Sequence, residues 1–395
     1  MRKVLALTNL FPNSLEPTRA TYNREIFTRL ACVVDLTLLV PISFLIFLKN
    51  PRLLKVLFSK DPHFAFAHYF VYFHLPGYLI RLNSLLMVLC VALQHPRVVF
   101  RLPFDVCFGS WLYPDADALR MISRLKKIAL VTMALGTDVN AGLFRPVTRA
   151  GTLRVLNAAR TNILVSNALK ETVIAEGVSR ESTQVIYTGV DRQKFKILPR
   201  QAAREQLELS QNDKIVLFVG SLITTKGCFE LVNAIAQIDK DRTMDIRLFI
   251  VGHGEQRPQL VEAVQALGIS QCVMFVGTVI PEELGVWYAA ADCFCLPSYR
   301  EGVPNVVLEA LACGIPVVAT NVGGIPEILQ DACGALIQPQ NTSELVGAIR
   351  RTLARDFNHE AIASSVSAFN WDDTVSKIIQ CLNDAKVIPN GLSKG

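Results

Sequence analysis

Short apolar runs that resemble buried strands alternate with helix-like segments along most of the chain. In the first half such runs occupy residues 3–8, 33–40, 127–132, 162–166 and 184–187. A second series begins at 214–220 and continues at 247–251, 273–276, 293–296, 317–319 and 335–337. Strands that alternate with helices form parallel sheets with helices on both faces. The sequence therefore predicts an α/β protein with two doubly wound, Rossmann-like domains.

The segment 191–211 between the two series contains no strand-like run, so we place the domain boundary there. We predict an N-terminal domain over 1–195 and a C-terminal domain over 210–365. A C-terminal helix within 366–395 is expected to pack back on the N-terminal domain. Doubly wound sheets bind ligands beyond the carboxyl ends of their strands. Two such domains predict a cleft for a substrate in two parts, one held by each domain.

The composition excludes several classes of protein. The chain has 395 residues, of which 51% are hydrophobic and 19% are charged, and its net charge is +6. That much apolar side chain excludes disorder, and so weak a charge argues against nucleic-acid binding. The ten cysteines form no CxxC pair, so we expect free thiols in a reducing compartment and no zinc site. The first apolar run is too short for a signal peptide, and none reaches the length of a membrane span.

The segment 44–58 leaves two interpretations open. It mixes leucine and phenylalanine with Lys49, Arg52 and Lys55. A basic amphipathic segment can lie in the headgroup region of an anionic membrane. The alternative, slightly favoured by this stretch alone, is a helix that faces the core and keeps its lysines in solvent.

The most informative stretch runs from residue 296 to 320. A buried strand ends near 297, a loop follows, and a helix is predicted from Asn305 to Cys313. The first N–H groups of a helix bind anions, phosphate above all. In this chain those groups belong to Val303, Asn305 and Val306.

Two carboxylates flank this predicted anion site, Glu301 before the helix and Glu309 within it. Ionised carboxylates only accept hydrogen bonds, whereas hydroxyls can donate them. The pattern therefore fits a phosphate ligand that also carries hydroxyls, such as a nucleotide with an attached sugar. In the alternative, Glu301 is a turn residue and Glu309 a solvated helix position, and the residues alone do not decide between the two.

These motifs resemble the family 4 glycosyltransferases, which are retaining enzymes with the GT-B fold. The likeness rests on Glu301-x7-Glu309, Gly314-x-Pro316-Val317-Val318, Gly323-Gly324-Ile325-Pro326-Glu327, Val219-Gly220 with Lys226-Gly227, Val251-Gly252-His253-Gly254 and Phe275-Val276-Gly277. In the first half, Thr8-Asn9, Trp111-x-Tyr113-Pro114-Asp115 and Gly136-Thr137-Asp138-Val139-Asn140 resemble the exopolysaccharide and teichuronic-acid branch. The resemblance extends over most of the chain.

The resemblance implies a role for each matching residue. Glu301 would contact the donor sugar near the anomeric carbon, Lys226 would neutralise the diphosphate leaving group, and Glu309 would accept the ribose hydroxyls. The remaining implied donor-binding residues are Val303, Asn305, Val306, Gly220, Ser221, Gly252 and Thr278. The implied acceptor-side residues are Ala20, Trp111 and Asp138.

No metal or cofactor is expected, because Lys226 and the helix terminus do the work that Mg²⁺ does elsewhere. Asp115-Ala-Asp117 has the spacing of a metal motif. It lies in the acceptor-side domain, and we interpret it as structural or acceptor-contacting.

The chain departs from the family pattern at three places. Ser221 stands where the family usually has arginine. Ala20 stands where glycine is frequent, and alanine can serve there if the backbone does not need a positive φ. Ser110 and Leu135 stand where related enzymes often carry histidine. His68 and His74 remain candidates on the acceptor side, although a lone histidine is more often structural.

The leading interpretation is a retaining, hexosyltransferase-type glycosyltransferase. It would move a sugar from a UDP- or GDP-sugar to a glycan or lipid-linked acceptor in cell-surface polysaccharide biosynthesis. It would be cytoplasmic, possibly held peripherally on the cytoplasmic face of an anionic membrane. The alternatives are a GT-B epimerase or phosphorylase, and a degenerate GT-B protein that only binds or scaffolds. The residues at positions 221, 110 and 135 motivate the degenerate alternative.

Overall fold

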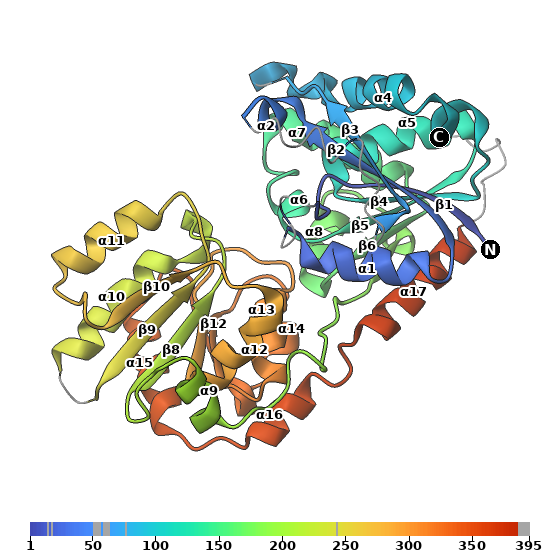
Figure 1. Cartoon of the computed structure of the whole chain (residues 1–395). Helices are drawn as coiled ribbons and strands as arrows, with labels where there is room; N and C mark the ends of the chain where they lie inside the picture. The colour runs from blue at the N-terminus through green and yellow to red at the C-terminus, as the bar shows by residue number, and fades with distance from the viewer. Residues whose placement is uncertain are drawn as a thin grey trace. The chain divides into compact units, whose positions relative to one another are not determined.

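The computed structural model describes residues 1–13, 16, 19–49, 57, 64–75, 77–241 and 244–385. The chain forms two compact units, Met1–Tyr187 with Trp371–Gly395, and Thr188–Asn370. Each unit has its own parallel sheet with helices on both faces (Figure 1). The prediction of two doubly wound α/β domains is therefore confirmed.

The first unit contains a seven-stranded parallel sheet in the order β3-β2-β1-β4-β5-β6-β7. The strands are β1 (Lys3–Leu7), β2 (Asp35–Ser43), β3 (Ala67–Tyr72), β4 (Val106–Ser110), β5 (Ala129–Ala134), β6 (Thr161–Leu164) and β7 (Thr183–Val185). The sequence analysis did not identify β3 and β4. β3 mixes histidine and tyrosine into its apolar residues, and β4 is five residues long and contains a glycine.

Helices cover both faces of this sheet (Figure 1). They are α1 (Thr21–Ala31), α2 (Phe44–Lys49), η3 (Gly77–Leu82), α4 (Asn83–Gln94), η4 (Arg97–Arg101), η5 (Leu112–Ala116), α5 (Asp117–Lys126), α6 (Thr137–Asn140), α7 (Pro146–Ala158), α8 (Asn167–Ala175), η6 (Arg180–Ser182) and α17 (Trp371–Asp384). One core cluster joins β1, β3 and β4 to the inner sides of α4 and α5.

The second unit contains a six-stranded parallel sheet in the order β10-β9-β8-β11-β12-β13. Its strands are β8 (Lys214–Val219), β9 (Ile246–Val251), β10 (Val273–Gly277), β11 (Cys293–Leu296), β12 (Val317–Thr320) and β13 (Gly334–Ile337). Its helices are α9 (Arg200–Gln206), η7 (Thr224–Lys226), α10 (Cys228–Lys240), α11 (Arg257–Ala266), α12 (Pro281–Ala290), α13 (Asn305–Ala312), α14 (Ile325–Ile328), η8 (Asp331–Cys333), α15 (Thr342–Ala354) and α16 (His359–Ser365).

The strand order reverses once in each sheet, between β1 and β4 in the first unit and between β8 and β11 in the second. At such a reversal the connections leave in opposite directions and open a crevice at the carboxyl ends of the strands. The topology therefore predicts one ligand site in each unit, beyond β1 and β4 and beyond β8 and β11.

The divisions between the units fall at residues 187 and 370, whereas the sequence analysis ended the first domain at 195 and began the second at 210. The segment after Tyr187 belongs to the second unit, where the ring of Phe195 packs on Tyr288 at 5.9 Å between centroids. The C-terminal helix α17 belongs to the first unit and packs against α1. Arg29 on α1 pairs with Asp372 on α17 at 3.2 Å.

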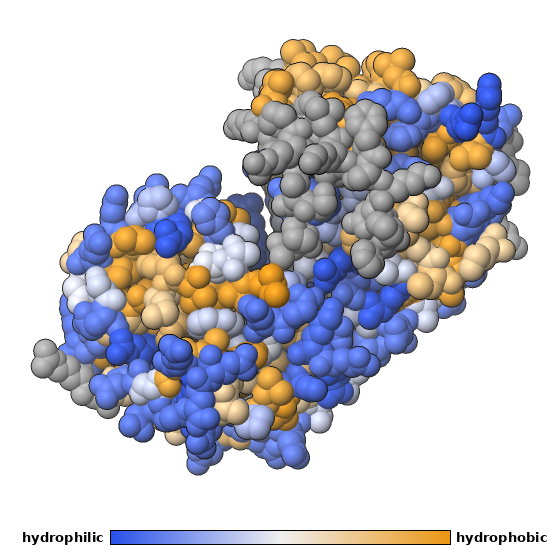
Figure 2. Space-filling view, viewed as in Figure 1, coloured by the Kyte–Doolittle hydropathy of each residue, from blue (hydrophilic) through white to orange (hydrophobic). Residues whose placement is uncertain are grey.

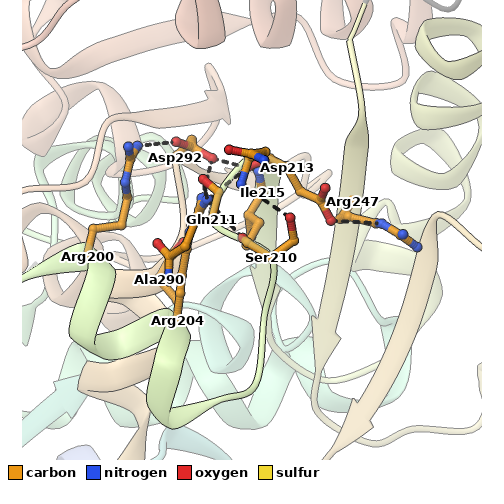
Figure 3. A network of polar contacts seen from close by, with 10 residues as sticks. Arg200, Arg204, Ser210, Gln211, Asp213, Ile215, Arg247, Ala290 and Asp292 are labelled. Atoms are coloured by element: carbon orange, nitrogen blue, oxygen red, sulfur yellow. Dashed lines mark hydrogen bonds and ion pairs between the residues drawn. The ribbon is translucent and has the colours of Figure 1, made fainter.

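A buried arginine attaches α9 to the amino-terminal edge of the second sheet (Figure 3). The Arg204 side chain is 1% exposed, and its guanidinium donates to Asp292 at 2.7 Å. It also donates to the carbonyl oxygens of Ala290, Ser210, Gln211 and Asp213. Asp292 in turn accepts from the backbone N–H of Ile215 on β8 at 2.7 Å. This network lies at the edge of the sheet away from the strands' carboxyl ends.

Other expectations concern cysteines and membranes. All ten cysteines are free, and nine of them are buried. No helix in the described part of the chain is both long enough and apolar enough to cross a membrane. In the segment 44–58, α2 covers Phe44–Lys49. Residues 50–56 and 58 lie outside the described residues, so the amphipathic helix proposed there stays a prediction.

Candidate functional site

In the second unit, an ion pair joins the loops that follow β8 and β11. Lys226 ends η7, and Glu301 lies between β11 and α13. The Nζ atom of Lys226 is 2.5 Å from Oε1 of Glu301, and their side chains are 22% and 9% exposed. The structure thus brings together the two residues for which the resemblance implied a catalytic role. They lie at the crevice that the topology predicts.

A glycine holds the lysine loop against the glutamate loop. Gly227 has φ +68, and a Cβ atom there would lie 2.1 Å from the carbonyl oxygen of Pro297. The backbone N–H of Tyr299 donates to the carbonyl oxygen of Thr225 at 2.8 Å. Because no other residue fits both this conformation and this approach, glycine fixes the position of Lys226 relative to Glu301.

The loop after β12 supports Glu301 from another direction. Gly323 has φ +55, and a Cβ atom there would lie 2.1 Å from the carbonyl oxygen of Glu301. The N–H of Gly324 donates to the carbonyl oxygen of Gly302 at 2.6 Å. The Gly-Gly motif at 323–324 therefore shapes the backbone that carries Glu301.

The second glutamate is hydrogen-bonded inside the site. Oε2 of Glu309 accepts a hydrogen bond from the Tyr288 hydroxyl at 2.9 Å. Tyr288 is fully buried and its ring packs against Phe195 and Phe294. Burial raises the pKa of Glu309 to about 7, and the Tyr288 hydrogen bond opposes that rise. Glu309 is thus a half-buried, hydrogen-bonded position rather than a fully solvated one.

The sequence analysis missed Tyr288. In sequence it lies 21 residues before Glu309 and reads as one more core aromatic residue of α12. The packing of α12 against α13 brings the hydroxyl to the carboxylate. A buried tyrosine usually finds a partner for its hydroxyl, which is the signal that could have indicated it.

Helix α13 begins at Asn305, and no side chain caps its start. The first N–H groups of a helix have no partner within the helix and favour an anion. The Asn305 side chain is turned to Thr188, whose hydroxyl donates to Oδ1 at 2.7 Å. Val303 is buried and Val306 is half-buried.

The other predicted donor-side residues follow the ends of β8, β9 and β10. The N–H of Gly220 donates to Val251, and the N–H of Gly252 donates to Gly277 at 2.7 Å. Ser221 and Thr278 are exposed beside them. Since neighbouring parallel strands end at the same edge, these residues lie along the edge that also carries Lys226 and Glu301.

In the first unit, a cavity of about 260 Å³ lies beyond β1, β2 and β3. Its polar lining includes Asn9, Asn13, Arg19, Ser43, Tyr72 and His74. Of the two candidate histidines, His74 lines this cavity and contacts the Ser43 hydroxyl through Nδ1 at 3.2 Å. The ring of His68 instead packs against His95.

Three buried polar atoms in this part of the first unit have no hydrogen-bond partner among the described residues; Asn9 and Tyr72 line the cavity, and Asp115 follows the lining residue Pro114. They are Oδ1 of Asn9, the hydroxyl of Tyr72 and Oδ1 of Asp115. The other carboxyl oxygen of Asp115 accepts from the N–H of Asn9. Burial raises the pKa of Asp115 to about 8, which favours the neutral carboxyl near pH 7. Buried polar atoms without partners are rare, and they indicate a place for water or a ligand.

Asp138 holds the turn before α6. Its Oδ1 accepts from the N–H groups of Leu135, Gly136 and Val139 at 3.0–3.1 Å. Its Oδ2 is buried without a partner among the described residues. Burial raises the pKa of Asp138 to about 6, against the lowering effect of these N–H groups. Leu135 thus contributes its backbone where related enzymes often carry a histidine.

Two predicted acceptor-side residues have unusual backbone conformations. Ala20 precedes α1 with φ +47 and ψ +55, so the condition set for alanine at this position, a backbone without a positive φ, is not met. Trp111 follows β4 with φ +94. Such conformations are strained for residues other than glycine and gather at functional sites.

Asp115 and Asp117 each have protein partners of their own. Asp117 is fully buried and pairs with Arg120 at 2.8 Å and Arg154 at 3.3 Å. Asp115 contacts Asn9 instead. Within the described ranges, no group of three or more histidine, cysteine or acidic side chains could hold a metal ion.

Comparison with known proteins gives two family matches along the chain. Residues 54–194 match the model described as Glycosyltransferase Family 4, and residues 199–369 match Glycosyl transferases group 1. The chain is 26% identical to the putative teichuronic acid biosynthesis glycosyltransferase TuaC of Bacillus subtilis, over 98% of this chain and 97% of that protein. It is 31% identical to the D-inositol 3-phosphate glycosyltransferase of Nocardia farcinica, over 70% of this chain. That match spans 64% of the Nocardia protein, less than two thirds of its length.

Solved structures share the fold over nearly the whole chain. Sucrose-phosphate synthase from Thermosynechococcus elongatus matches with a TM-score of 0.75 at 22% identity, over 97% of this chain and 98% of that one. Anabaena HepE in complex with UDP matches with a TM-score of 0.73 at 21% identity, over 97% of this chain and 100% of that one. At these identities the likeness concerns the fold.

Proposed function

Because this chain belongs to the family 4 glycosyltransferases and has the two-domain GT-B fold, we propose that it is a retaining hexosyltransferase. It transfers a sugar from a nucleotide-diphosphate sugar, linked to UDP or GDP, to a glycan or lipid-linked acceptor of cell-surface polysaccharide. The observation that carries the proposal is the Lys226–Glu301 ion pair at the strand reversal of the second unit.

Lys226 and the start of α13 receive the diphosphate. The ammonium group of Lys226 contacts Glu301, which belongs to the loop that leads into α13. Negative charge on the diphosphate grows as the bond to the sugar breaks. A fixed cation and fixed N–H dipoles stabilise that charge more in the transition state than in the ground state. With these groups in place we propose that transfer needs no metal ion.

Glu301 and Glu309 receive the hydroxyl groups of the donor. Both carboxylates accept hydrogen bonds when ionised, Glu301 from the sugar and Glu309 from the ribose. A diphosphate competes with Glu301 for Lys226, and the hydroxyls of the sugar then replace the lysine as its partners. Solved HepE structures hold UDP and UDP-glucose, which supports a nucleotide sugar as the ligand.

The cavity of the first unit receives the acceptor. Its unpartnered atoms on Asn9 and Tyr72 call for groups that both donate and accept hydrogen bonds. Sugar hydroxyls do both. The similarity to a protein named for teichuronic acid biosynthesis supports a polysaccharide acceptor.

We place the reaction in the cytoplasm, at the inner face of the membrane where lipid-linked acceptors are elongated. Nine buried, unpaired thiols suit a reducing compartment.

A panel of nucleotide sugars tests the donor site, first by thermal stabilisation and then by calorimetry. A ligand present at a hundred times its Kd stabilises the fold by about 2.7 kcal/mol. We expect one sugar nucleotide to bind, and Glu309→Ala and Lys226→Ala to lose that binding. The exposed pair Glu262→Ala and Lys240→Ala serves as the control and binds as the wild type does.

The results separate the alternatives. Unchanged binding in Glu309→Ala contradicts the donor site. Conversion of the sugar in the donor without any acceptor identifies an epimerase. Binding without hydrolysis or transfer on any acceptor identifies a protein that only binds. Activity that disappears with EDTA and returns with Mg²⁺ contradicts metal-independent transfer.

A further inference from the structure

Helix α4 of the first unit is apolar on the side that faces away from the core. It carries no charged residue over its twelve positions. Its inner side, with Met87, Cys90 and Val91, is buried in the core. The exposed fractions on the outer side are 45%, 47%, 50% and 82% for Leu82, Leu85, Leu89 and Leu93. Figure 2 shows hydrophobic surface gathered where Figure 1 places α4.

These leucines form one stripe. Their spacing of three, four and four residues places them on one face of the helix. A helix that is apolar all round is buried in a core or in contact with lipid. Single exposed leucines are ordinary, but a contiguous apolar patch marks an interaction site. The outer face of α4 therefore has the character of an interaction surface.

Arginines surround this stripe. The helices η3 and η4 pack against α4 and carry the exposed residues Arg81, Arg97 and Arg101. The sequence contains no aspartate or glutamate from Phe64 to Phe104. We call these three arginines and the four leucines the α4 surface. Its charge complements an anionic partner.

The neighbouring helix α5 extends the positive charge. Arg124 and Lys127 are exposed at its end. Its one carboxylate, Asp117, is fully buried between Arg120 and Arg154. No exposed carboxylate of α4, α5, η3 or η4 therefore offsets the arginines.

We propose that the α4 surface docks on an anionic lipid bilayer. The leucines enter the boundary of the acyl chains, and the arginines contact the phosphate groups of the lipid heads. Protein interfaces also use aromatic side chains and directional hydrogen bonds. Helix α4 has no aromatic residue, and its Gln94 amide is already bound to the backbone of Val71 at 2.8 and 2.9 Å. This docking is independent of the transfer reaction and is tested without substrate.

Flotation with vesicles tests the proposal. Vesicles of phosphatidylglycerol and phosphatidylcholine in equal parts should carry the full chain, and vesicles of phosphatidylcholine alone should carry much less. Changing Leu85, Leu89 and Leu93 together to glutamine should weaken binding by about a hundredfold. The matched control changes Phe144, Ile197 and Met274 to glutamine, which are 63%, 43% and 52% exposed elsewhere on the chain. This control should bind as the wild type does.

The charge contribution is measured separately. Removing Arg97 or Arg101 should weaken binding to phosphatidylglycerol vesicles by about fivefold each. Raising the salt concentration should act in the same direction. Leu93→Trp should gain quenching by lipids with brominated chains relative to the wild type, and Phe144→Trp should not.

Several results overturn the proposal. The first is a wild-type chain that fails to float with phosphatidylglycerol vesicles at low salt. The second is a leucine triple variant, with native circular dichroism and melting, that still floats. The third is a wild-type dimer in sedimentation that becomes a monomer in the triple variant, without vesicle binding by either. That third result assigns the α4 surface to contact between two copies of this chain.

Discussion

Removing the Tyr288 hydroxyl should weaken nucleotide-sugar binding at neutral pH and below, and leave it nearly unchanged at pH 9. In the proposed donor site the ribose hydroxyls bind the ionised form of Glu309, whose pKa is raised to about 7 by burial. The ionised fraction of the wild-type carboxyl then rises from about a tenth at pH 6 to about nine tenths at pH 8. The wild-type Kd should therefore fall about tenfold between those two pH values.

Tyr288→Phe keeps the ring against Phe195 and Phe294 and removes the O–H that donates to Glu309 at 2.9 Å. A hydrogen bond to a charged group contributes about 1.5–3 kcal/mol, so its loss raises the pKa of Glu309 by about one to two units. At pH 7 the ionised fraction drops from about a half to about a tenth or less, and Kd rises about fivefold or more. At pH 9 both proteins are mostly ionised and the difference closes if the shift is about one unit.

Calorimetry from pH 6 to pH 9 measures this effect. UDP-glucose, or the nucleotide sugar that the panel selects, is the titrant, because its diester phosphates stay ionised over the whole range. Tyr299→Phe is the matched control, since that hydroxyl donates to Glu230 at 2.5 Å in the same unit. A wild-type Kd that is equal at pH 6 and pH 8 would refute the reasoning. So would a Tyr288→Phe profile that superimposes on the wild type.

Three further changes test the structure around the sites. Arg204→Ala leaves a buried charge network without its centre and should lower the free energy of unfolding by about 3–5 kcal/mol in urea, with Arg204→Lys less affected. Asp115→Asn should have a higher Tm than the wild type at pH 7. The pKa of Asp115 is raised to about 8 in the folded chain, so ionisation of this carboxyl stabilises the unfolded chain as the pH rises. The difference in Tm between Asp115→Asn and the wild type should grow between about pH 4 and 8, and a difference that is constant with pH contradicts a neutral carboxyl. Gly227→Ala, with φ +68 and a contact of 2.1 Å to Pro297, should lower the free energy of unfolding by more than about 1 kcal/mol and weaken donor binding, measured by denaturation and calorimetry.

The donor-side residues could be predicted because the chemistry lies in short motifs. Glu301, Glu309 and the start of α13 follow one another within a single strand–loop–helix unit. Lys226 lies in the loop of another strand–loop–helix motif of the same sheet, and the parallel sheet brings both loops to one edge. Spacing along the sequence therefore reports nearness in space.

In the first unit, several features could not be predicted from the sequence. Asp115 and Tyr72 come from different elements, and their nearness depends on β3 and β4, which the apolar pattern did not reveal. The positive φ of Ala20 follows from how the chain enters α1, and an alanine in the sequence does not indicate a positive φ. The pKa of Glu309 depends on burial against Tyr288, which is a property of packing between α12 and α13.

The return of α17 to the first unit has a consequence for synthesis and for cleavage. The chain passes from one unit to the other after Tyr187 and back after Asn370. The whole second unit is therefore synthesised before the last helix of the first unit, α17. The packing of α1 on α17, with the Arg29–Asp372 pair, can form only after that. A protease that cuts one crossing leaves the other as a tether. Truncation before α17, by contrast, removes a packing partner from the unit that is synthesised first.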